Sequence, residues 1–85
     1  MSASDIIPGM VARELVDACG LDGMKLHHMY DINWRQTVYR LDVDAGHHVT
    51  FRVDQEDHRE PLDAFYEKHL APVVQAVFAH KLEAA

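Results

Sequence analysis

Two alternating segments and the short link between them decide the fold: Thr37-Val38-Tyr39-Arg40-Leu41-Asp42-Val43, then Asp44-Ala45-Gly46, then His47-His48-Val49-Thr50-Phe51-Arg52-Val53. Apolar and polar residues alternate in both segments, as in strands with one buried face. The pattern predicts a β-hairpin with a three-residue loop, in which Gly46 takes the left-handed conformation. The predicted pairs are Val43–His47, Leu41–Val49, Tyr39–Phe51 and Thr37–Val53. This register gathers the large apolar side chains on one face, and a shift by one residue would expose one strand's set.

A helix and a strand are expected before the hairpin. Pro8 suits a first helical turn and Gly20 a left-handed C-terminal cap, so the helix is predicted over Pro8 to Cys19. The residues expected on its core face are Ile7, Val11, Leu15, Ala18 and Cys19. Asp22-Gly23 then predicts a turn into a strand from Met24 to Tyr30, whose even-numbered residues should face the core.

A long helix is expected after the hairpin, ending near Leu82. Asp57 followed by Glu60 fits a capping box, and Pro61 suits the first turn. Pro72 lies inside this helix, where a proline removes a backbone hydrogen bond and costs about 3 kcal/mol or more. We therefore expect a kink or a break at Pro72.

The element order is helix, strand, strand, strand, helix. It predicts an α+β two-layer sandwich in which a three-stranded antiparallel sheet carries both helices on one face. Residues 1–6 are expected to form a flexible N-terminal tail, and residues 7–85 a single α+β domain with one small core. Double-stranded-RNA-binding domains share this order but hold phosphates with lysines at the start of the last helix. That place reads Glu56-Asp57-His58-Arg59-Glu60 here. The sign of its charge is wrong, so we reject the match.

Composition argues against a membrane-spanning protein and against a nucleic-acid-binding protein, and it favours the cytoplasm. No apolar run approaches the ~20 residues of a membrane span, so no membrane partner is expected. The net charge of −6 argues against a nucleic-acid partner bound through bulk charge. The first residues lack the basic and apolar parts of a signal peptide. Cys19 is the only cysteine, so no internal disulfide can form, and a cytoplasmic location is expected.

Seven histidines raise the question of a metal site. His58, His69 and His80 are spaced so that each step spans ~16 Å along a helix, whereas zinc needs ligand atoms ~2 Å from one ion. His27-His28 and His47-His48 are adjacent on strands, so the members of each pair point to opposite faces. We therefore predict ordinary packing or surface roles for the histidines, no metal and no cofactor.

The sequence contains no recognisable catalytic constellation, and we expect no enzyme. The serines, Ser2 and Ser4, lie in the predicted tail. Cys19 lies at a helix C-terminus, where the dipole disfavours a thiolate. Asp42 and His48 face each other across the predicted hairpin, which suits a stabilising cross-strand pair better than a catalytic couple.

Two surfaces are candidates for binding. On the sheet face away from the helices, large apolar side chains gather with cations, as in the centre of an interface. The predicted site residues there are Lys25, Met29, Trp34, Val38, Arg40 and Arg52. The second candidate is an acidic stretch comprising Asp54, Glu56, Asp57, Glu60, Asp63 and Glu67. It is either a solvated helix start, where acids favour the helix dipole, or a docking patch for a basic partner.

Three function classes follow. The leading hypothesis is a small acidic protein–protein interaction module, such as an inhibitor, an adaptor or an immunity- or antitoxin-like protein, including a phage-type inhibitor of a nucleic-acid-binding host protein. Its partner would be another protein or a second copy of the chain in a homodimer. The alternative is a nucleic-acid-binding module in which Trp34 stacks a base and Arg40, Arg52 and Lys25 hold phosphates. The third class is a histidine-dependent metal or pH-responsive module.

Overall fold

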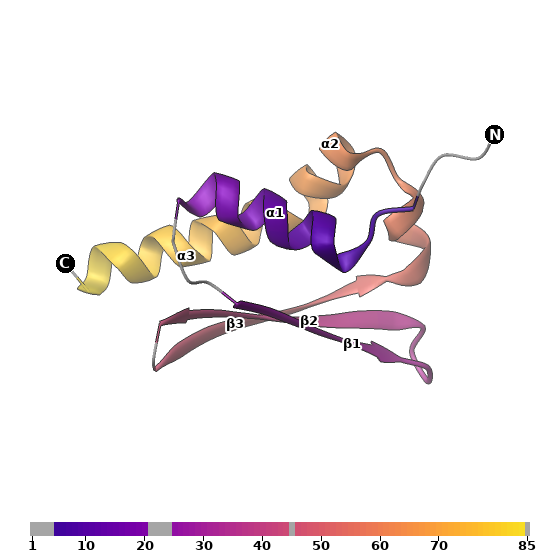
Figure 1. The fold of residues 1–85 in the computed structure, drawn as a ribbon, viewed down its shortest axis with the longest axis horizontal. Helices are drawn as coiled ribbons and strands as arrows, with labels where there is room; N and C mark the ends of the chain where they lie inside the picture. The colour runs from indigo at the N-terminus through magenta and orange to yellow at the C-terminus, as the bar shows by residue number, and fades with distance from the viewer. Residues whose placement is uncertain (1–4, 21–24, 45, 85) are drawn as a thin grey trace.

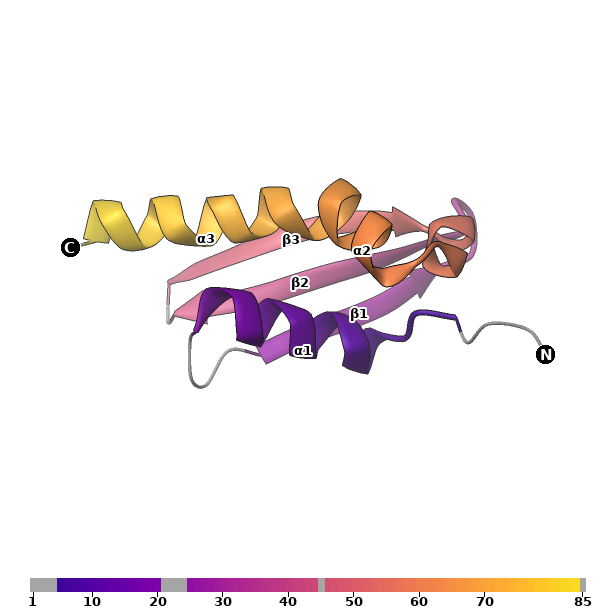
Figure 2. The ribbon, with the colours of Figure 1, turned by 90° about the horizontal axis from the view of Figure 1, so that it is seen from above.

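The predicted order of elements is confirmed by the structure, a computed structural model that describes residues 5–20, 25–44 and 46–84, with side chains up to Glu83. Its elements are α1 (Pro8–Cys19), β1 (Lys25–Asp31), β2 (Gln36–Asp44), β3 (His47–Asp54), a 3₁₀ helix (Gln55–Arg59), α2 (Leu62–Phe65), a π-helical turn (Tyr66–Leu70) and α3 (Ala71–Ala84). The strands form an antiparallel sheet in the order β1-β2-β3. Figures 1 and 2 show α1, α2 and α3 on one face of this sheet.

The hairpin register is confirmed along most of its length and is wrong next to the turn. Leu41 lies opposite Val49, Tyr39 opposite Phe51, and Thr37 opposite Val53. Near the turn Asp44, not Val43, pairs with His47, and the register shifts between Asp42 and Asp44. Val43 is therefore the extra residue of a β-bulge, which increases the local twist. The turn conformation involves Ala45, which lies outside the described residues, so the left-handed Gly46 stays a prediction.

Helix α1 has the predicted bounds, but the residue that packs into the core just before it is Ile6 and not Ile7. Gly20 is left-handed, with φ 63°, and its N–H donates to the Val16 carbonyl over 2.8 Å. Ile7 is exposed, contrary to prediction, whereas Ile6 is buried and its N–H donates to the His58 carbonyl over 2.7 Å. The extended backbone before Pro8 places Ile6 in the core, so the predicted tail does not include Ile6. The predicted turn Asp22-Gly23 and Met24 lie outside the described residues.

Strand β1 packs less of its helix-facing side than predicted. Leu26 is partly buried against the core, but His28 and Tyr30 are exposed. β1 is an edge strand, and Figure 1 shows that its C-terminal end extends beyond the start of α1. Helix α1 therefore cannot cover the whole strand.

The last helix is kinked but not broken at Pro72. The π-helical turn lies directly before it, and the Ala71 N–H donates to the Tyr66 carbonyl, five residues back. A π-helical turn widens the helix locally, and this keeps the proline ring away from the preceding carbonyls. Figure 1 shows α2 inclined to α3. The predicted capping box of Asp57 and Glu60 is wrong. Helix α2 begins at Leu62, its N-cap residue is Pro61, and no side chain caps its first turn.

The core lies between the sheet and the helices. Its largest fully buried side chains are Tyr39, Phe65, Leu15, Leu41 and Leu70. Phe51 is only partly buried, contrary to prediction, although its ring stacks on Tyr39 with centroids 5.0 Å apart. Among the helical residues that the structure describes, no segment combines the length and the apolar composition needed to cross a bilayer.

Candidate protein-binding surfaces

Strands β1 and β2 form a second hairpin, distinct from the β2–β3 hairpin described above. Its loop end exposes four large apolar side chains within six residues. The exposed fractions are 67% for Met29, 49% for Tyr30, 78% for Ile32 and 72% for Trp34. We call these four residues the apolar hairpin end. They account for four of the eight large apolar residues that are exposed in the described chain. The sequence analysis includes Met29 and Trp34 among the site residues but not Ile32, and it places Tyr30 on the core side of its strand.

The loop that carries Ile32 and Trp34 is fixed by hydrogen bonds at both ends. The Asp31 carboxylate accepts the N–H of Asn33 at 3.0 Å and that of Trp34 at 3.4 Å. Arg35 is left-handed, with φ 51°, and its carbonyl accepts the Gln55 N–H at 2.9 Å. The loop is therefore tied both to β1 and to the 3₁₀ helix.

Trp34 lies beside the start of the acidic stretch, not over the middle of the sheet. It lines a groove of about 340 Å³ together with Arg35, Asp54, Gln55, Glu56 and Arg59. Two arginines and two carboxylates thus line the groove together with Trp34. The groove has balanced charge and borders the apolar hairpin end.

The outer sheet face contains a separate shallow depression of about 370 Å³, lined by His27, His28, Met29, Val38, Arg40 and Thr50. Of the predicted sheet-face residues, only Met29, Val38 and Arg40 line it. Lys25 lies on the same face opposite Asp42, and Trp34 belongs to the groove described above. The predicted single site is therefore divided.

The arginines of the outer face are paired within the chain. The Arg40 Nε lies 3.2 Å from Asp42, which also binds His27 at 2.9 Å, and Arg52 lies 3.4 Å from Asp31. Partial desolvation favours the protonated Asp42, but the His27 hydrogen bond and the nearby Arg40 charge outweigh it and lower the pKa of Asp42. Asp42 is opposite His48 in the register, yet its hydrogen bond goes to His27.

The acidic stretch does not form one patch either. The Asp57 carboxylate binds His69 at 2.8 Å and Lys68 at 3.2 Å, and Glu60 binds Lys68 at 3.3 Å. Burial disfavours the charge on Asp57, but the His69 and Lys68 hydrogen bonds outweigh it and lower the pKa of this carboxyl. Hydrogen bonds to Asp57 and Glu60 raise the pKa of Lys68. These four residues join the 3₁₀ helix to the last helix, so Asp57 and Glu60 have a structural role.

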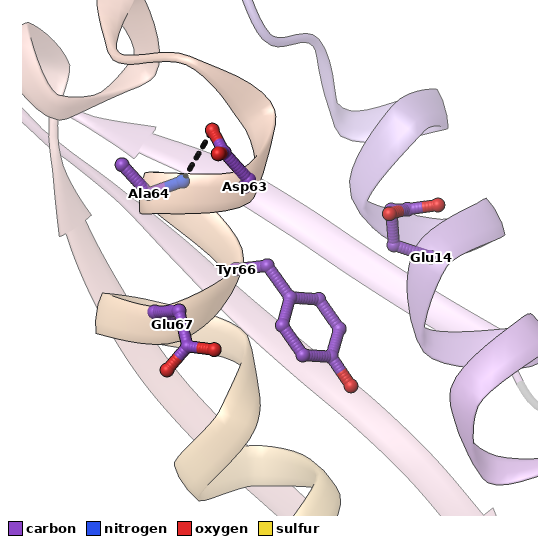
Figure 3. Close-up of a pocket in the computed structure, with 5 residues that line it drawn as sticks. All are labelled: Glu14, Asp63, Ala64, Tyr66 and Glu67. Atoms are coloured by element: carbon purple, nitrogen blue, oxygen red, sulfur yellow. Dashed lines mark hydrogen bonds between the residues drawn. The ribbon is translucent and has the colours of Figure 1, made fainter.

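Asp63 and Glu67 line a groove between α1 and α2, and Glu14 of α1 completes its acidic rim (Figure 3). The groove has a volume of about 490 Å³, and Figure 3 shows the Tyr66 ring between the carboxylates of Glu14 and Glu67. The sequence analysis does not include Glu14 in the acidic stretch, because Glu14 lies in α1, far from Asp63 and Glu67 in the sequence. The groove therefore combines acidic side chains with an aromatic one.

Four histidines have hydrogen-bond partners within the described chain, namely His27 and His69 as given above, His58 and His80. His58 is buried, where its Nε2 lies 2.8 Å from the Tyr39 hydroxyl. His80 binds Asp44 at 2.6 Å and stacks on His47 with ring centroids 3.8 Å apart. Within the described part of the chain, no three His, Cys, Asp or Glu side chains converge as a metal ion would require.

Comparison with known proteins adds no functional information. The sequence matches no protein-family model, and no curated protein and no solved structure gives a significant match.

Proposed function

We propose that this chain is a small protein-binding module that acts as an inhibitor or an adaptor, and that the apolar hairpin end is its contact surface. The observation that supports this proposal is that four large apolar side chains are exposed to solvent at one end of the molecule, those of Met29, Tyr30, Ile32 and Trp34. Large apolar side chains that stay exposed together at one end of a monomer favour a partner-binding role there. Tryptophan and arginine also dominate the energies of protein interfaces, and Arg35 and Arg59 lie beside Trp34.

The preorganised loop also supports binding through the hairpin end. Two N–H groups bind Asp31, and the Arg35 carbonyl accepts the Gln55 N–H. A loop that is already ordered loses less conformational entropy when a partner binds. Its apolar tip therefore suits an apolar pocket on another protein, with charged groups around the rim that match the balanced charges beside Trp34.

The pairing of Arg40 and Arg52 makes nucleic acid the weaker alternative. Both guanidinium groups lie beside carboxylates of the same face, so phosphates would have to compete with Asp42 and Asp31. Nucleic-acid affinity depends on cations that neutralise phosphates. We also propose a cytoplasmic location, which the single buried thiol of Cys19 supports.

The test compares Trp34→Ala with Ile7→Ala, a control that removes an exposed apolar side chain from the start of α1. Tagged wild type and both variants are used to capture proteins from native cells, followed by calorimetry with the purified partner. We expect a partner that wild type and Ile7→Ala retain and that Trp34→Ala binds with about 30-fold lower affinity, which corresponds to ~2 kcal/mol.

Two outcomes would contradict the proposal. Trp34→Ala could bind the partner as tightly as the control, which would exclude the hairpin end. Alternatively, single-stranded oligonucleotide could bind tightly in a salt-dependent manner that Arg40→Ala combined with Arg52→Ala abolishes. That result would assign the outer face to nucleic acid.

A further inference from the structure

The outer edge of β1 carries backbone groups that have no partner among the described residues. The sheet order is β1-β2-β3, so β1 pairs with β2 on one side only. Its seven residues contain no proline and no bulge, which are features that protect an exposed edge strand from further pairing. Four consecutive residues, His27 to Tyr30, are exposed. The edge is therefore open to an additional strand.

The direction of the backbone groups in the sheet follows from one hydrogen bond. The Gln55 N–H donates to the Arg35 carbonyl in register with the β2–β3 ladder. Odd-numbered residues of β2 up to the bulge therefore direct their N–H and C=O groups to β3, and even-numbered residues direct theirs to β1. The even-numbered residues of β2 pair with odd-numbered residues of β1. It follows that the backbone groups of Leu26, His28 and Tyr30 point away from β2, to the open edge.

Helix α1 overlies this edge. Figure 2 shows α1 along the side of β1 that lies away from β2, and Figure 1 shows α1 above the plane of the sheet. Glu14 lines the groove toward α2, and helical geometry places Ala12 and Val16 on the opposite flank of α1. Val16 is 39% exposed although its side chain is apolar. A strand added to β1 would therefore lie beneath this flank and cover apolar surface.

We propose that the outer edge of β1 binds an extended segment of the partner protein, which adds to the sheet as a fourth, antiparallel strand. The inference rests on the proposed function for the source of this segment, and it deepens that function. Met29 and Tyr30 belong both to β1 and to the apolar hairpin end, so the two contact surfaces are continuous. Strand addition gains affinity from main-chain hydrogen bonds and specificity from alternate side chains. Antiparallel pairing is slightly more stable than parallel pairing.

The chemistry of the segment follows from β1. Its residues opposite Leu26, His28 and Tyr30 would lie on the same side of the sheet as α1, so apolar side chains fit at these alternate positions. An acidic residue fits opposite the exposed Lys25. A second copy of β1 does not fit, because a two-fold pairing of β1 strands would place both α1 helices over the same edge (Figure 2).

The first test uses an acetylated and amidated heptapeptide of sequence KVTVTVE, whose valines lie opposite Leu26, His28 and Tyr30. Amide hydrogen exchange of the protein is followed by NMR with and without saturating peptide. The amides of these three residues should exchange rapidly in the free protein and about tenfold more slowly with peptide. The amides of Thr50 and Arg52, which by the same alternation face the other edge of the sheet, should not change. A control peptide with N-methylated valines lacks the donors that face β1 and should protect none of them.

The second test changes the edge itself. His28→Pro removes the N–H at the centre of the open edge and leaves the hydrogen bonds to β2 in place, whereas His28→Ala removes the same side chain and keeps the N–H. We expect His28→Pro to bind the peptide about tenfold or more weakly than His28→Ala, and circular dichroism should show both variants folded. If His28→Pro does not fold, the N-methylated peptide still decides whether backbone donors at this edge are used.

The peptide has no residue opposite Ile32 or Trp34, so its binding reports on the edge alone. The inference would be overturned by edge amides that are already protected in the free protein, or by equal protection from the N-methylated peptide. Equal peptide binding by His28→Pro and His28→Ala would overturn it as well. No protection by the peptide, together with a partner that Trp34→Ala fails to bind, would reject the edge and keep the proposed function. Protection of the edge with a partner that tolerates Trp34→Ala would support the edge and reject the hairpin end.

Discussion

The Tyr39 hydroxyl makes the polar contact at the centre of the core. It lies 2.8 Å from the His58 Nε2, and the His58 Nδ1 lies 3.0 Å from the Asp54 carbonyl. Because a carbonyl can only accept, Nδ1 carries the hydrogen and Nε2 accepts from Tyr39. Burial raises the pKa of Tyr39 to about 12, which keeps the hydroxyl protonated as a donor. The contact joins the middle strand to the 3₁₀ helix.

Truncation of the stacked pair Tyr39 and Phe51 should have unequal effects. Tyr39 is fully buried, so Tyr39→Ala should lower the free energy of unfolding by ~3–5 kcal/mol. Phe51 is only partly buried, so Phe51→Ala should cost less. Tyr39→Phe should cost ~1–3 kcal/mol, because it leaves Nε2 of His58 without a donor. Urea unfolding with an unchanged m-value measures all three. A loss for Phe51→Ala as large as that for Tyr39→Ala would show that the two burial environments do not differ.

At the scale of elements, the β1–β2 loop combines hydrogen bonds with one strained residue. Arg35 has a φ of 51°, a conformation in which the Cβ of a residue other than glycine is crowded at a cost of ~1–2 kcal/mol. This conformation directs the Arg35 carbonyl to the Gln55 N–H and allows the chain to enter β2 directly. The strain accompanies the exposed position of Trp34 one residue earlier, at the proposed contact surface.

Removal of this strain should stabilise the protein. Arg35→Gly allows the left-handed conformation freely, whereas Arg35→Ala removes the same long side chain and retains the Cβ. We expect Arg35→Gly to be more stable than Arg35→Ala by about 0.5–1 kcal/mol, because the gain in the folded state exceeds the entropy that glycine adds to the unfolded chain. Thermal unfolding of the two variants gives the difference. Equal stabilities would mean that the loop is not strained at Arg35.

At the scale of the whole molecule, the features that could be predicted from the sequence are those that local residue patterns determine. Alternation in β2 and β3 is sufficient for the Tyr39–Phe51 register, and Pro8 with Gly20 is sufficient for the bounds of α1. Some errors occur at transitions between elements, and others concern how deeply strand residues are buried, as at His28, Tyr30 and Phe51. Ile6 replaces Ile7 in the core because the chain before α1 is extended, and no helical periodicity includes such a residue.

The surfaces were harder to predict because they depend on contacts between residues distant in sequence. Arg52 is neutralised by Asp31 across the sheet, and Asp57 by His69 of the last helix. Glu14 meets Asp63 and Glu67 only because α1 packs beside α2. Composition shows these charges but not their partners, so the predicted patches were larger and more uniform than the real ones.

Three aspartates that bind residues distant in the sequence make the free energy of unfolding depend on pH in the acidic range. Hydrogen bonds from His80 and the Gly46 N–H lower the pKa of Asp44, and the contacts described above lower the pKa of Asp42 and Asp57. Asp44 joins the hairpin turn to α3, Asp57 joins the 3₁₀ helix to the last helix, and Asp42 joins β2 to β1. Protonation of these carboxylates would therefore weaken contacts throughout the molecule.

The sign of the effect follows from the direction of the shifts. An unfolded aspartate has a pKa of about 3.9, and the folded values are lower, so the unfolded state binds protons first as the pH falls. The stabilisation is complete above the unfolded pKa and is lost as the pH falls through the folded pKa values. We expect urea midpoints to fall steadily with pH below about 4. Asp57→Asn should reduce that slope, since one linked proton is removed, and the double variant with Asp44→Asn should reduce it further. A slope unchanged in both variants would show that the acid sensitivity arises elsewhere in the chain.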